Sequence, residues 1–173
     1  MNQPQPMVAD LFRRFTDRSR TAVVKSESFA RREGSATVDP RHLLLGVIAA
    51  EGTGHAALSA AGDVQSLVQL ATVDDEAFAH LPHVPYRAES KKVLELALVV
   101  AIAAEHNEIR TEHLLAAVID AQDEEVRRML TAHRLDVTPL REALPASDPE
   151  ARATARQTLS APVPLREVPM PKE

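Results

Sequence analysis

Residues 15–42 read FTDRSRTAVVKSESFARREGSATVDPRH, residues 86–113 read YRAESKKVLELALVVAIAAEHNEIRTEH, and a pair of leucines follows each stretch. The two stretches align without a gap at a constant offset of 71 residues (86 − 15 and 113 − 42). Val38 then matches Ile109, and His42 matches His113. Because a fixed internal period indicates one structural unit built twice, we predict two packed copies of a helical unit with a seam between them.

The composition favours an all-α fold with an aliphatic core. Hydrophobic residues make up 45% of the 173 residues, but aromatic residues make up only 3%, and glycine occurs five times. Long runs of Ala, Leu, Glu and Arg are typical of helices, and no segment keeps the two-residue alternation of a strand. We predict about four helices in each copy.

Prolines mark the predicted boundaries, because they deny helix to the segments that contain them. Pro82 and Pro85 lie in the connector between the copies, and Pro145 precedes a change in composition. Residues 151–159 are expected to form at most a marginal helix that does not dock, since they lack an apolar stripe. We therefore predict a flexible segment at 1–9, a first repeat at 10–82, a second repeat at 83–145 and a Pro-rich, disordered tail at 146–173.

Capping residues predict where several helices begin and end. Thr16 and Asp39 are suited to N-caps, and Gly34 to a left-handed helix end. The copy of the second helix is expected to begin at Thr111-Glu112. Residues 64–79 are predicted to form one helix.

The helix predicted at residues 89–105 is apolar on nearly all sides. Such a helix is buried on more than one face. We expect it to lie between the repeats, with one strip open to a partner.

The sequence lacks the signature motifs of several functional classes. No Gly-Lys pair occurs, so there is no P-loop, and neither Gly-x-Ser-x-Gly nor His-Glu-x-x-His is present. The chain has no cysteine and a net charge of −5, which disfavours thiol chemistry and nucleic-acid binding. The apolar run at residues 96–104 is too short to span a membrane, and the N-terminus does not resemble a signal peptide. We expect a cytoplasmic protein that is not an enzyme and uses no cofactor.

The seven histidines do not suggest a metal site. His80 and His83 are separated by Pro82, so they do not share a helix face. His42 and His113 occupy equivalent positions, which indicates one structural role: a half-buried histidine that hydrogen-bonds the preceding turn. We expect no metal ion, because the repeat does not supply acidic or histidine partners.

Two sets of motifs resemble the N-terminal (Clp repeat) domain of Clp C unfoldases. The first set is FRRFTDRSR at residues 12–20 with RHLLLGV at 41–47, and the second is KKVLEL at 91–96 with TEHLL at 111–115. The resemblance covers residues 11–144. It implies a pseudo-symmetric bundle of two four-helix repeats, here without the two ATPase rings that follow this domain in the unfoldases.

The resemblance also implies a surface for peptides, adaptor proteins and, in actinobacteria, cyclic-peptide antibiotics. The family builds it from the N-terminal aromatic segment and the first helix of each repeat. It would be an apolar floor with a lysine and a glutamate at its edge, which suits a peptide. Val23, Leu94 and Leu98 are equally well explained as core residues. The matching residues are Phe12, Val23, Val24, Tyr86, Lys91, Leu94, Glu95, Leu98 and Ile102.

A second surface of the family binds phosphorylated arginine through the opening threonine and the Thr-Glu-His glutamate of each repeat. Thr16 and Glu112 match this pattern, but Arg41 replaces the first glutamate and Arg87 the second threonine. Since Arg41 would repel a guanidinium group, we expect phosphoarginine binding to be weakened or lost. The family's Gly-x-Gly-x-Ala run is kept only at residues 52–56.

The function expected from this resemblance is a non-catalytic binding module of the Clp protease system, acting as a decoy for, or modulator of, the Clp C unfoldase. The alternative is an accessory structural subunit that docks on the Clp P peptidase or Clp C ATPase ring. A ligand-binding module should bind a cyclic peptide as a monomer, whereas a docking subunit should co-purify with the ring. An enzyme and a helix-turn-helix regulator are both disfavoured.

Overall fold

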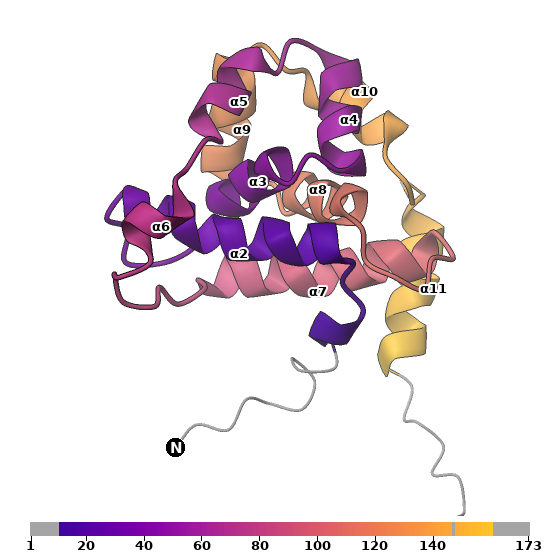
Figure 1. Cartoon of the computed structure of the whole chain (residues 1–173). Coiled ribbons are helices and arrows are strands. Elements are labelled where there is room, and N and C mark those ends of the chain that lie inside the picture. The colour runs from indigo at the N-terminus through magenta and orange to yellow at the C-terminus, as the bar shows by residue number, and fades with distance from the viewer. Residues whose placement is uncertain (1–10, 147, 161–173) are drawn as a thin grey trace, which may run out of the picture.

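The computed structural model describes residues 11–146 and 148–160, where the chain is all-α and β-type pairing is limited to two isolated bridges (Figure 1). The predicted segment 1–9 and the Pro-rich residues 161–173 lie outside the described residues. The predicted all-α class, with two pseudo-symmetric repeats, is confirmed. The helices are α2 (Asp17–Arg32), α3 (Pro40–Ala49), α4 (Thr53–Ala61), α5 (Gln65–Leu70), α6 (Asp75–Phe78), α7 (Ala88–Ala103), α8 (Thr111–Asp120), α9 (Glu124–Ala132), α10 (Val137–Ala143) and α11 (Pro149–Ser160).

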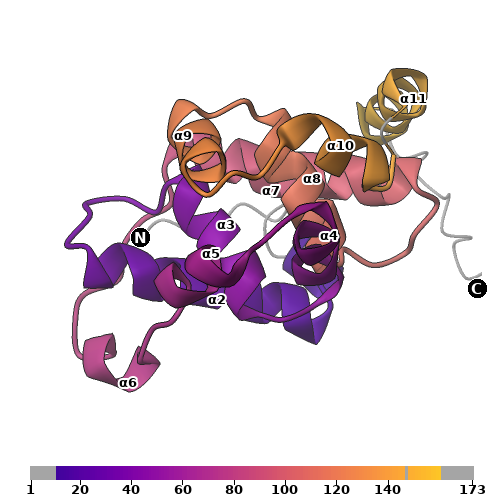
Figure 2. The same cartoon turned by 90° about the horizontal axis from the view of Figure 1, so that it is seen from above.

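Apart from α6 and α11, the helices lie in three tiers. In Figure 1, α2 and α7 form the lower tier, α3 and α8 lie above them, and α4, α5, α9 and α10 form the top. Seen from above, α4 and α5 occupy one side and α9 and α10 the other (Figure 2). The middle tier is almost fully buried, so α3 and α8 are the centre of the core. That core is mainly aliphatic, as predicted, although Phe29 is among its fully buried side chains.

Two isolated parallel bridges join the repeats, and each is the image of the other. Phe15 pairs with Ile109, and Tyr86 pairs with Val38. The offset of 71 residues converts Phe15 into Tyr86 and Val38 into Ile109, so the repeats exchange equivalent segments. We call residues 15–19 with residues 109–113 the first junction, and residues 86–90 with residues 38–42 the second junction.

Capping groups explain the helix ends that the sequence predicts. The Thr16 hydroxyl accepts the backbone N–H of Ser19 at 3.3 Å and caps α2. Gly34 follows α2 with a φ of 65°, the left-handed conformation that glycine adopts without strain. Pro40 is the first residue of α3, behind Asp39. Thr111 begins α8, as predicted.

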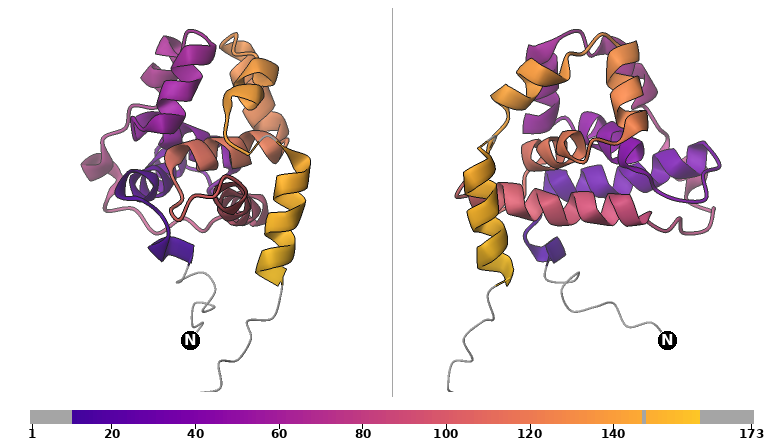
Figure 3. Two further views of the ribbon diagram at one scale, coloured as in Figure 1. Left: turned by 90° about the vertical axis from the view of Figure 1, so that its right-hand side faces the viewer. Right: turned by 180° about the vertical axis from the view of Figure 1, so that it is seen from behind.

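Helix α7 is buried on two sides, as its sequence predicts, but the expected place between the repeats was wrong: α7 lies in the lower tier, because the more fully apolar α3 and α8 occupy the centre. Val93, Ala97 and Val100 share a face that lies in the main core and is fully buried. Val99 falls on the opposite face by helical periodicity, yet it is only 7% exposed and lies outside that core cluster. Helix α11 packs on α7 on the side turned away from α2 (Figure 3), and we infer that it covers Val99.

Residues 64–79 form two helices, so the single predicted helix was wrong. Helix α5 ends at Leu70 and α6 begins at Asp75. Arg32 of α2 donates hydrogen bonds to the carbonyl oxygens of Leu70 (2.8 Å) and Thr72 (2.9 Å). Asp74 then caps α6 by accepting the N–H of Glu76. Hydrogen bonds from α2, which is distant in the sequence, therefore stabilise the interruption between α5 and α6.

Helix α11 is the largest departure from expectation. The sequence predicts an undocked segment here, yet α11 has 12 residues and its Arg152 and Ala155 are buried. The Arg152 guanidinium donates to the carbonyl oxygen of Ala146 and forms an ion pair with Asp120 at the end of α8. The prediction of a disordered tail was therefore wrong for residues 149–160, because a charged contact replaces the missing apolar stripe.

The described helices include none that alone combines the length and hydropathy of a membrane span. Helices α3 and α4 meet those criteria only when taken together, and they are bent by 97° with respect to each other.

Candidate binding site between the repeats

The two junctions are built by the same hydrogen bonds. At the first, the carbonyl oxygen of Ile109 accepts the backbone N–H of Thr16 at 3.1 Å and the hydroxyl of Ser19 at 2.6 Å. At the second, the Val38 carbonyl oxygen accepts the N–H of Arg87 at 3.1 Å and the hydroxyl of Ser90 at 2.6 Å. Each junction therefore brings the start of one repeat's first helix against the segment that leads into the other repeat's second helix.

This exchange decides which candidate residues share a junction. Thr16 opens α2 and Glu112 lies in the first turn of α8, so both belong to the first junction. The Glu112 carboxylate is 20% exposed, with Oε1 3.8 Å from Nη1 of Arg110. The Thr16 hydroxyl lies 3.0 Å from the Ser19 hydroxyl. A carboxylate, a hydroxyl and two helix starts therefore belong to one junction.

The second junction carries both of the arginine replacements, Arg41 and Arg87. Nη2 of Arg41 lies 2.5 Å from Oε2 of Glu33. Nε of Arg87 lies 2.9 Å from Oε2 of Glu89, and its Nη1 lies 3.9 Å from Oδ1 of Asp39. Both guanidinium groups are thus held by carboxylates of the chain itself.

The ion pair at the second junction outweighs the cost of burying its carboxylate. Burial alone would raise the pKa of Glu33, but hydrogen bonds from Arg41 and His42 favour the charged form, and the pKa is lowered overall. Glu33 is therefore ionised near neutral pH, and Arg41 remains paired with it.

The Gly-x-Gly motif supports the first turn of α8. The backbone N–H of Gly54 donates to the Thr111 hydroxyl at 2.9 Å. A Cβ at Gly54 would lie 2.7 Å from the carbonyl oxygen of Thr111 and 2.7 Å from Cγ1 of Val47, which is too close. A Cβ at Gly52 would meet the Thr111 hydroxyl at 2.4 Å. These glycines therefore let α4 approach the turn that carries Glu112.

His42 and His113 have the shared structural role that the sequence predicts, although they are fully rather than half buried. Nδ1 of each ring accepts the backbone N–H three residues earlier, from Asp39 or Arg110, at 2.9 Å. Burial lowers the pKa of both rings. The pKa of His113 falls to about 4, since the charges of His106 and Arg110 add to the effect of burial.

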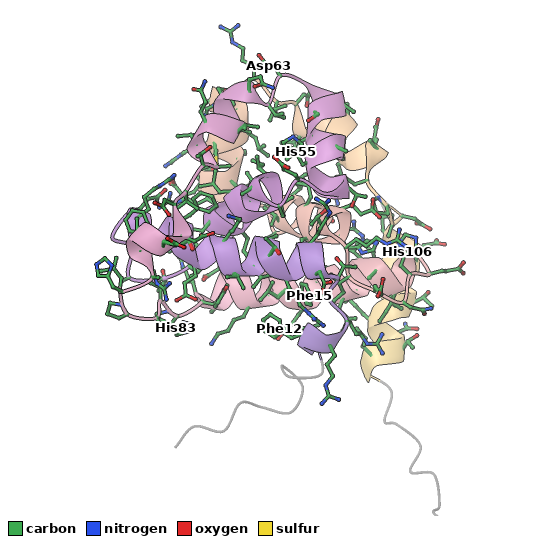
Figure 4. All side chains as sticks on the ribbon, viewed as in Figure 1. Phe12, Phe15, His55, Asp63, His83 and His106 are labelled. Carbon is green, nitrogen blue, oxygen red and sulfur yellow. The ribbon has the colours of Figure 1, made fainter. Side chains whose placement is uncertain are left out.

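His113 has neighbours that the sequence analysis did not foresee. Its Nε2 lies 2.8 Å from Nδ1 of His106 and 3.9 Å from Oε1 of Glu112. Figure 4 shows His106 just beyond the end of α7. The expectation that the repeat supplies no such partners was therefore wrong, since ligand atoms of these three residues lie within 4.8 Å of one another.

The hydrogen bonds of His113 nevertheless do not suit a metal ligand. Because Nδ1 accepts the N–H of Arg110, the proton of the neutral ring lies on Nε2. That proton is donated to His106, which leaves no lone pair of His113 for a metal ion. The cluster is better described as a hydrogen-bond chain that fixes the first turn of α8.

The nine residues predicted to form the peptide surface differ in exposure. Val23 and Leu94 are only 3% and 6% exposed and belong to the core, as the alternative interpretation holds. Val24 is 65% exposed. The others are either partly buried (Phe12, Tyr86, Leu98 and Ile102) or exposed (Lys91 and Glu95).

Two of the aromatic residues in this region have structural contacts. The Tyr86 hydroxyl donates to the carbonyl oxygen of Val23 at 2.8 Å, and burial raises its pKa. The ring of Phe12 lies 5.5 Å from that of Phe15 between centroids, and Figure 4 shows both below α2. Tyr86 therefore ties the start of α7 to α2.

Two hollows lie away from this surface. One, of about 350 Å³, is formed where the ends of α4 and α9 meet, and Figure 4 shows Asp63 at this end of the molecule. The other, of about 360 Å³, lies beside α8, α9 and α10. The first is lined by Asp63, Ser66, Ala132, His133 and Arg134, and the second by Ile119, Gln122, Asp123, Val126, Arg127, Leu130 and Val137.

Sequence reasoning missed Ser19, Ser90 and His106. The two serines are equivalent under the repeat offset, and this was a usable signal because both are serine in otherwise different helices. His106 has no equivalent histidine in the first repeat, where Ser35 stands. Its contact with His113 depends on the loop after α7, which no periodicity predicts.

Comparison with known proteins agrees with this architecture. The sequence pattern of the Clp repeat (R) N-terminal domain matches residues 14–133. An uncharacterized protein of Mycobacterium tuberculosis is 39% identical over 118 residues, which are 65% of this chain and 45% of that protein. A ClpA-homologue ATP-binding subunit of an ATP-dependent Clp protease from Guillardia theta is 34% identical over 137 residues, or 76% of this chain and 16% of the subunit.

Solved structures share the fold. The N-terminal domain of the chaperone ClpD from Arabidopsis thaliana superposes with a TM-score of 0.56 at 21% identity, covering 87% of this chain and 97% of that domain. The N-terminal domain of Hsp104 from Candida albicans gives a TM-score of 0.56 at 14% identity, covering 85% and 91%. The chain spans less than half the length of the curated relatives that it matches.

Proposed function

Because the chain belongs to the Clp repeat (R) N-terminal domain family, we propose that it is a non-catalytic binding module of the Clp chaperone and protease system. Its ligands in this proposal are peptides, adaptor proteins or cyclic-peptide antibiotics. By holding them, it acts as a decoy for, or modulator of, a Clp C-type unfoldase.

The observation that supports this proposal most strongly is that Thr16 and Glu112 lie on segments that meet at the first junction. A phosphorylated arginine carries a guanidinium group and a phosphate. The carboxylate of Glu112 suits the first, and the N-terminal ends of α2 and α8 suit the second. The segments that carry these residues are joined through the carbonyl oxygen of Ile109.

The second junction lacks this combination. Arg41 and Arg87 replace the matching residues, and both are engaged by carboxylates of the chain. The proposal is therefore that one phosphoarginine site remains and one is lost. This is a weakened form of the family's binding, as expected from the sequence, rather than its complete loss.

Calorimetric titration with a short peptide that carries one phosphoarginine tests this proposal. We expect a stoichiometry of one for the wild type and no binding of the same peptide with plain arginine. Glu112→Gln should weaken binding by about tenfold or more, because the negative charge that pairs with the guanidinium group is lost. The matched control is Arg41→Gln at the second junction, which should leave the affinity unchanged.

Two results would count against the phosphoarginine site. One is a loss of binding in Arg41→Gln with Glu112→Gln unaffected. The other is the absence of binding by a folded wild type. If such a chain also failed to bind a cyclic peptide but co-purified with Clp ring components, the accessory-subunit function would replace the proposed one.

The apolar surface on the lower tier is proposed as the site for cyclic peptides. Val24 supplies exposed aliphatic area there, and Leu98 and Ile102 are partly exposed. Lys91 and Glu95 are exposed charged residues of α7 that can pair with polar groups of a peptide. An apolar patch rimmed by charged residues is typical of a protein-binding surface, and the proposal is that these residues form one.

A further inference from the structure

Helix α11 rests on a face of α7 that the main core does not use. Val99, on that face, is 7% exposed although it lies opposite the core residues of α7. The equivalent residue in the first repeat is Ser28, which is 5% exposed and contacts Asp75 of α6. Both first helices therefore carry a small outer helix at the same position.

A buried carboxylate holds α11 in place. The Asp120 side chain is 5% exposed and ends α8. Its Oδ2 pairs with Arg152, which is 9% exposed, and its Oδ1 lies 2.9 Å from Nη2 of Arg141. The residue equivalent to Asp120 in the first repeat is Ala49, so this carboxylate is specific to the side where α11 docks.

The remaining contacts of α11 are slight. Most of its side chains are exposed, and Leu159 is 46% exposed. Ala155, at 3% exposure, is its one buried apolar side chain in the described part. A helix with so little buried apolar area opens more readily than the core beneath it.

We propose that the face of α7 around Val99, together with Asp120, is a docking surface for an amphipathic helix of another protein that carries an arginine. Helix α11 occupies this surface in the free chain and shows the chemistry that fits. An arginine reaches the buried carboxylate, and a small residue three positions later lies against α7. A partner helix with this pattern would displace α11.

This surface is separate from the first junction, but on α7 it adjoins the proposed peptide surface, because Glu95 and Ile102 lie one turn from Val99. The proposal does not rest on the proposed function, and either can fail without the other. The charge requirement is specific, because Arg141 pairs only with Oδ1 of the buried Asp120, so its Oδ2 loses its ion pair when Arg152 leaves. A lysine does not match the planar, forked geometry of arginine.

The absence of cysteine from the chain allows a direct test in the full-length protein. Val99→Cys places a single thiol under α11, and Val100→Cys places one in the main core as the matched control. The rate of modification by N-ethylmaleimide reports how often each thiol becomes accessible. Circular dichroism checks that each variant is folded.

We expect the thiol of Val99→Cys to react much faster than that of Val100→Cys. Adding Arg152→Ala should raise the first rate by about tenfold or more, since a hydrogen bond to a charged group is lost, and leave the second unchanged. Arg156→Ala, an exposed arginine one turn further along α11, is the control and should change neither rate.

A peptide of residues 149–160 then serves as the partner helix. Added at millimolar concentration to the Val99→Cys, Arg152→Ala variant, this peptide should slow the modification again. The same peptide with the Arg152→Ala substitution should not. Equal rates for the two thiols would overturn the proposal, because α11 would then open only on global unfolding. The proposal would equally be overturned if the unsubstituted peptide did not protect the thiol from modification.

Discussion

The hydroxyl of Ser19 donates a 2.6 Å hydrogen bond to the carbonyl oxygen of Ile109 in the other repeat. Ser90 donates a bond of the same length to Val38 in the opposite direction. Both serines are fully buried. Two equivalent side chains thus join the two repeats at the junctions, one of which carries the proposed ligand site.

Removing either hydroxyl should loosen the seam. Ser19→Ala and Ser90→Ala should each lower the free energy of unfolding by about 1–2 kcal/mol, because a buried carbonyl oxygen loses one of its two donors. Since the serines lie at different junctions, the losses should be nearly additive in the double variant. Urea denaturation measures this, with exposed Ser59→Ala as the control. A double variant as stable as the wild type would contradict the proposed role of these bonds.

The close approach of α4 to α8 predicts a steric effect. Gly54→Ala would bring a methyl group against the carbonyl oxygen of Thr111 and should destabilise the fold by about 1–3 kcal/mol. It should also weaken phosphoarginine binding, since the first turn of α8 would shift. The control is Ala60→Gly, at an exposed position of α4, which should cost about 1 kcal/mol and leave binding intact. Unchanged stability of Gly54→Ala would show that the helices can separate freely.

Buried His113 predicts loss of stability in acid. Its pKa is about 4 in the folded chain, against a usual value of 6.5, so the unfolded chain takes up a proton first. The contribution of this ring to stability is complete above pH 6.5 and declines by up to about 1.4 kcal/mol per pH unit towards pH 4. His113→Gln should therefore lower stability at neutral pH but flatten its dependence on pH in this window.

Urea unfolding at several pH values tests this prediction. The control is His80→Gln, which replaces an exposed histidine and should keep the slope of the wild type. If His113→Gln showed the same slope as the wild type, the ring would not be the group that titrates.

Neighbouring valines on α2 should respond in opposite ways. Val23 is buried, so Val23→Ala should cost about 1–3 kcal/mol of stability. Val24 is 65% exposed, so Val24→Ser should leave stability within about 0.5 kcal/mol. If the lower-tier surface binds a cyclic peptide, Val24→Ser should nevertheless weaken that binding, as measured by calorimetry. Equal affinity for Val24→Ser and the wild type would remove Val24 from the site.

The fold could be predicted from sequence because its determinants are local or repeat at a fixed offset. Thr16, Gly34 and Pro40 mark helix ends through their own backbone preferences. The matched positions of Val38 and Ile109 revealed the pseudo-symmetry, and the structure adds that these positions exchange partners between the repeats.

The features that sequence did not predict depend on contacts between distant residues. A hydrogen bond from Arg32 interrupts the helix predicted for residues 64–79. Asp120 forms an ion pair with Arg152, which lies 32 residues further along the chain. The assignment of Thr16 and Glu112 to one junction also requires the exchange of segments. Periodicity describes the faces of single helices, and it does not say which charged groups will meet.

Amide NMR titration with the phosphoarginine peptide tests the proposed function most directly, because the two junctions serve as internal controls for each other. We expect chemical-shift changes at residues 16–19 and 109–113, and none at the equivalent residues 87–90 and 38–42. Equal shifts at both junctions, or shifts confined to the second, would contradict the proposal that this chain keeps a single site built on Thr16 and Glu112.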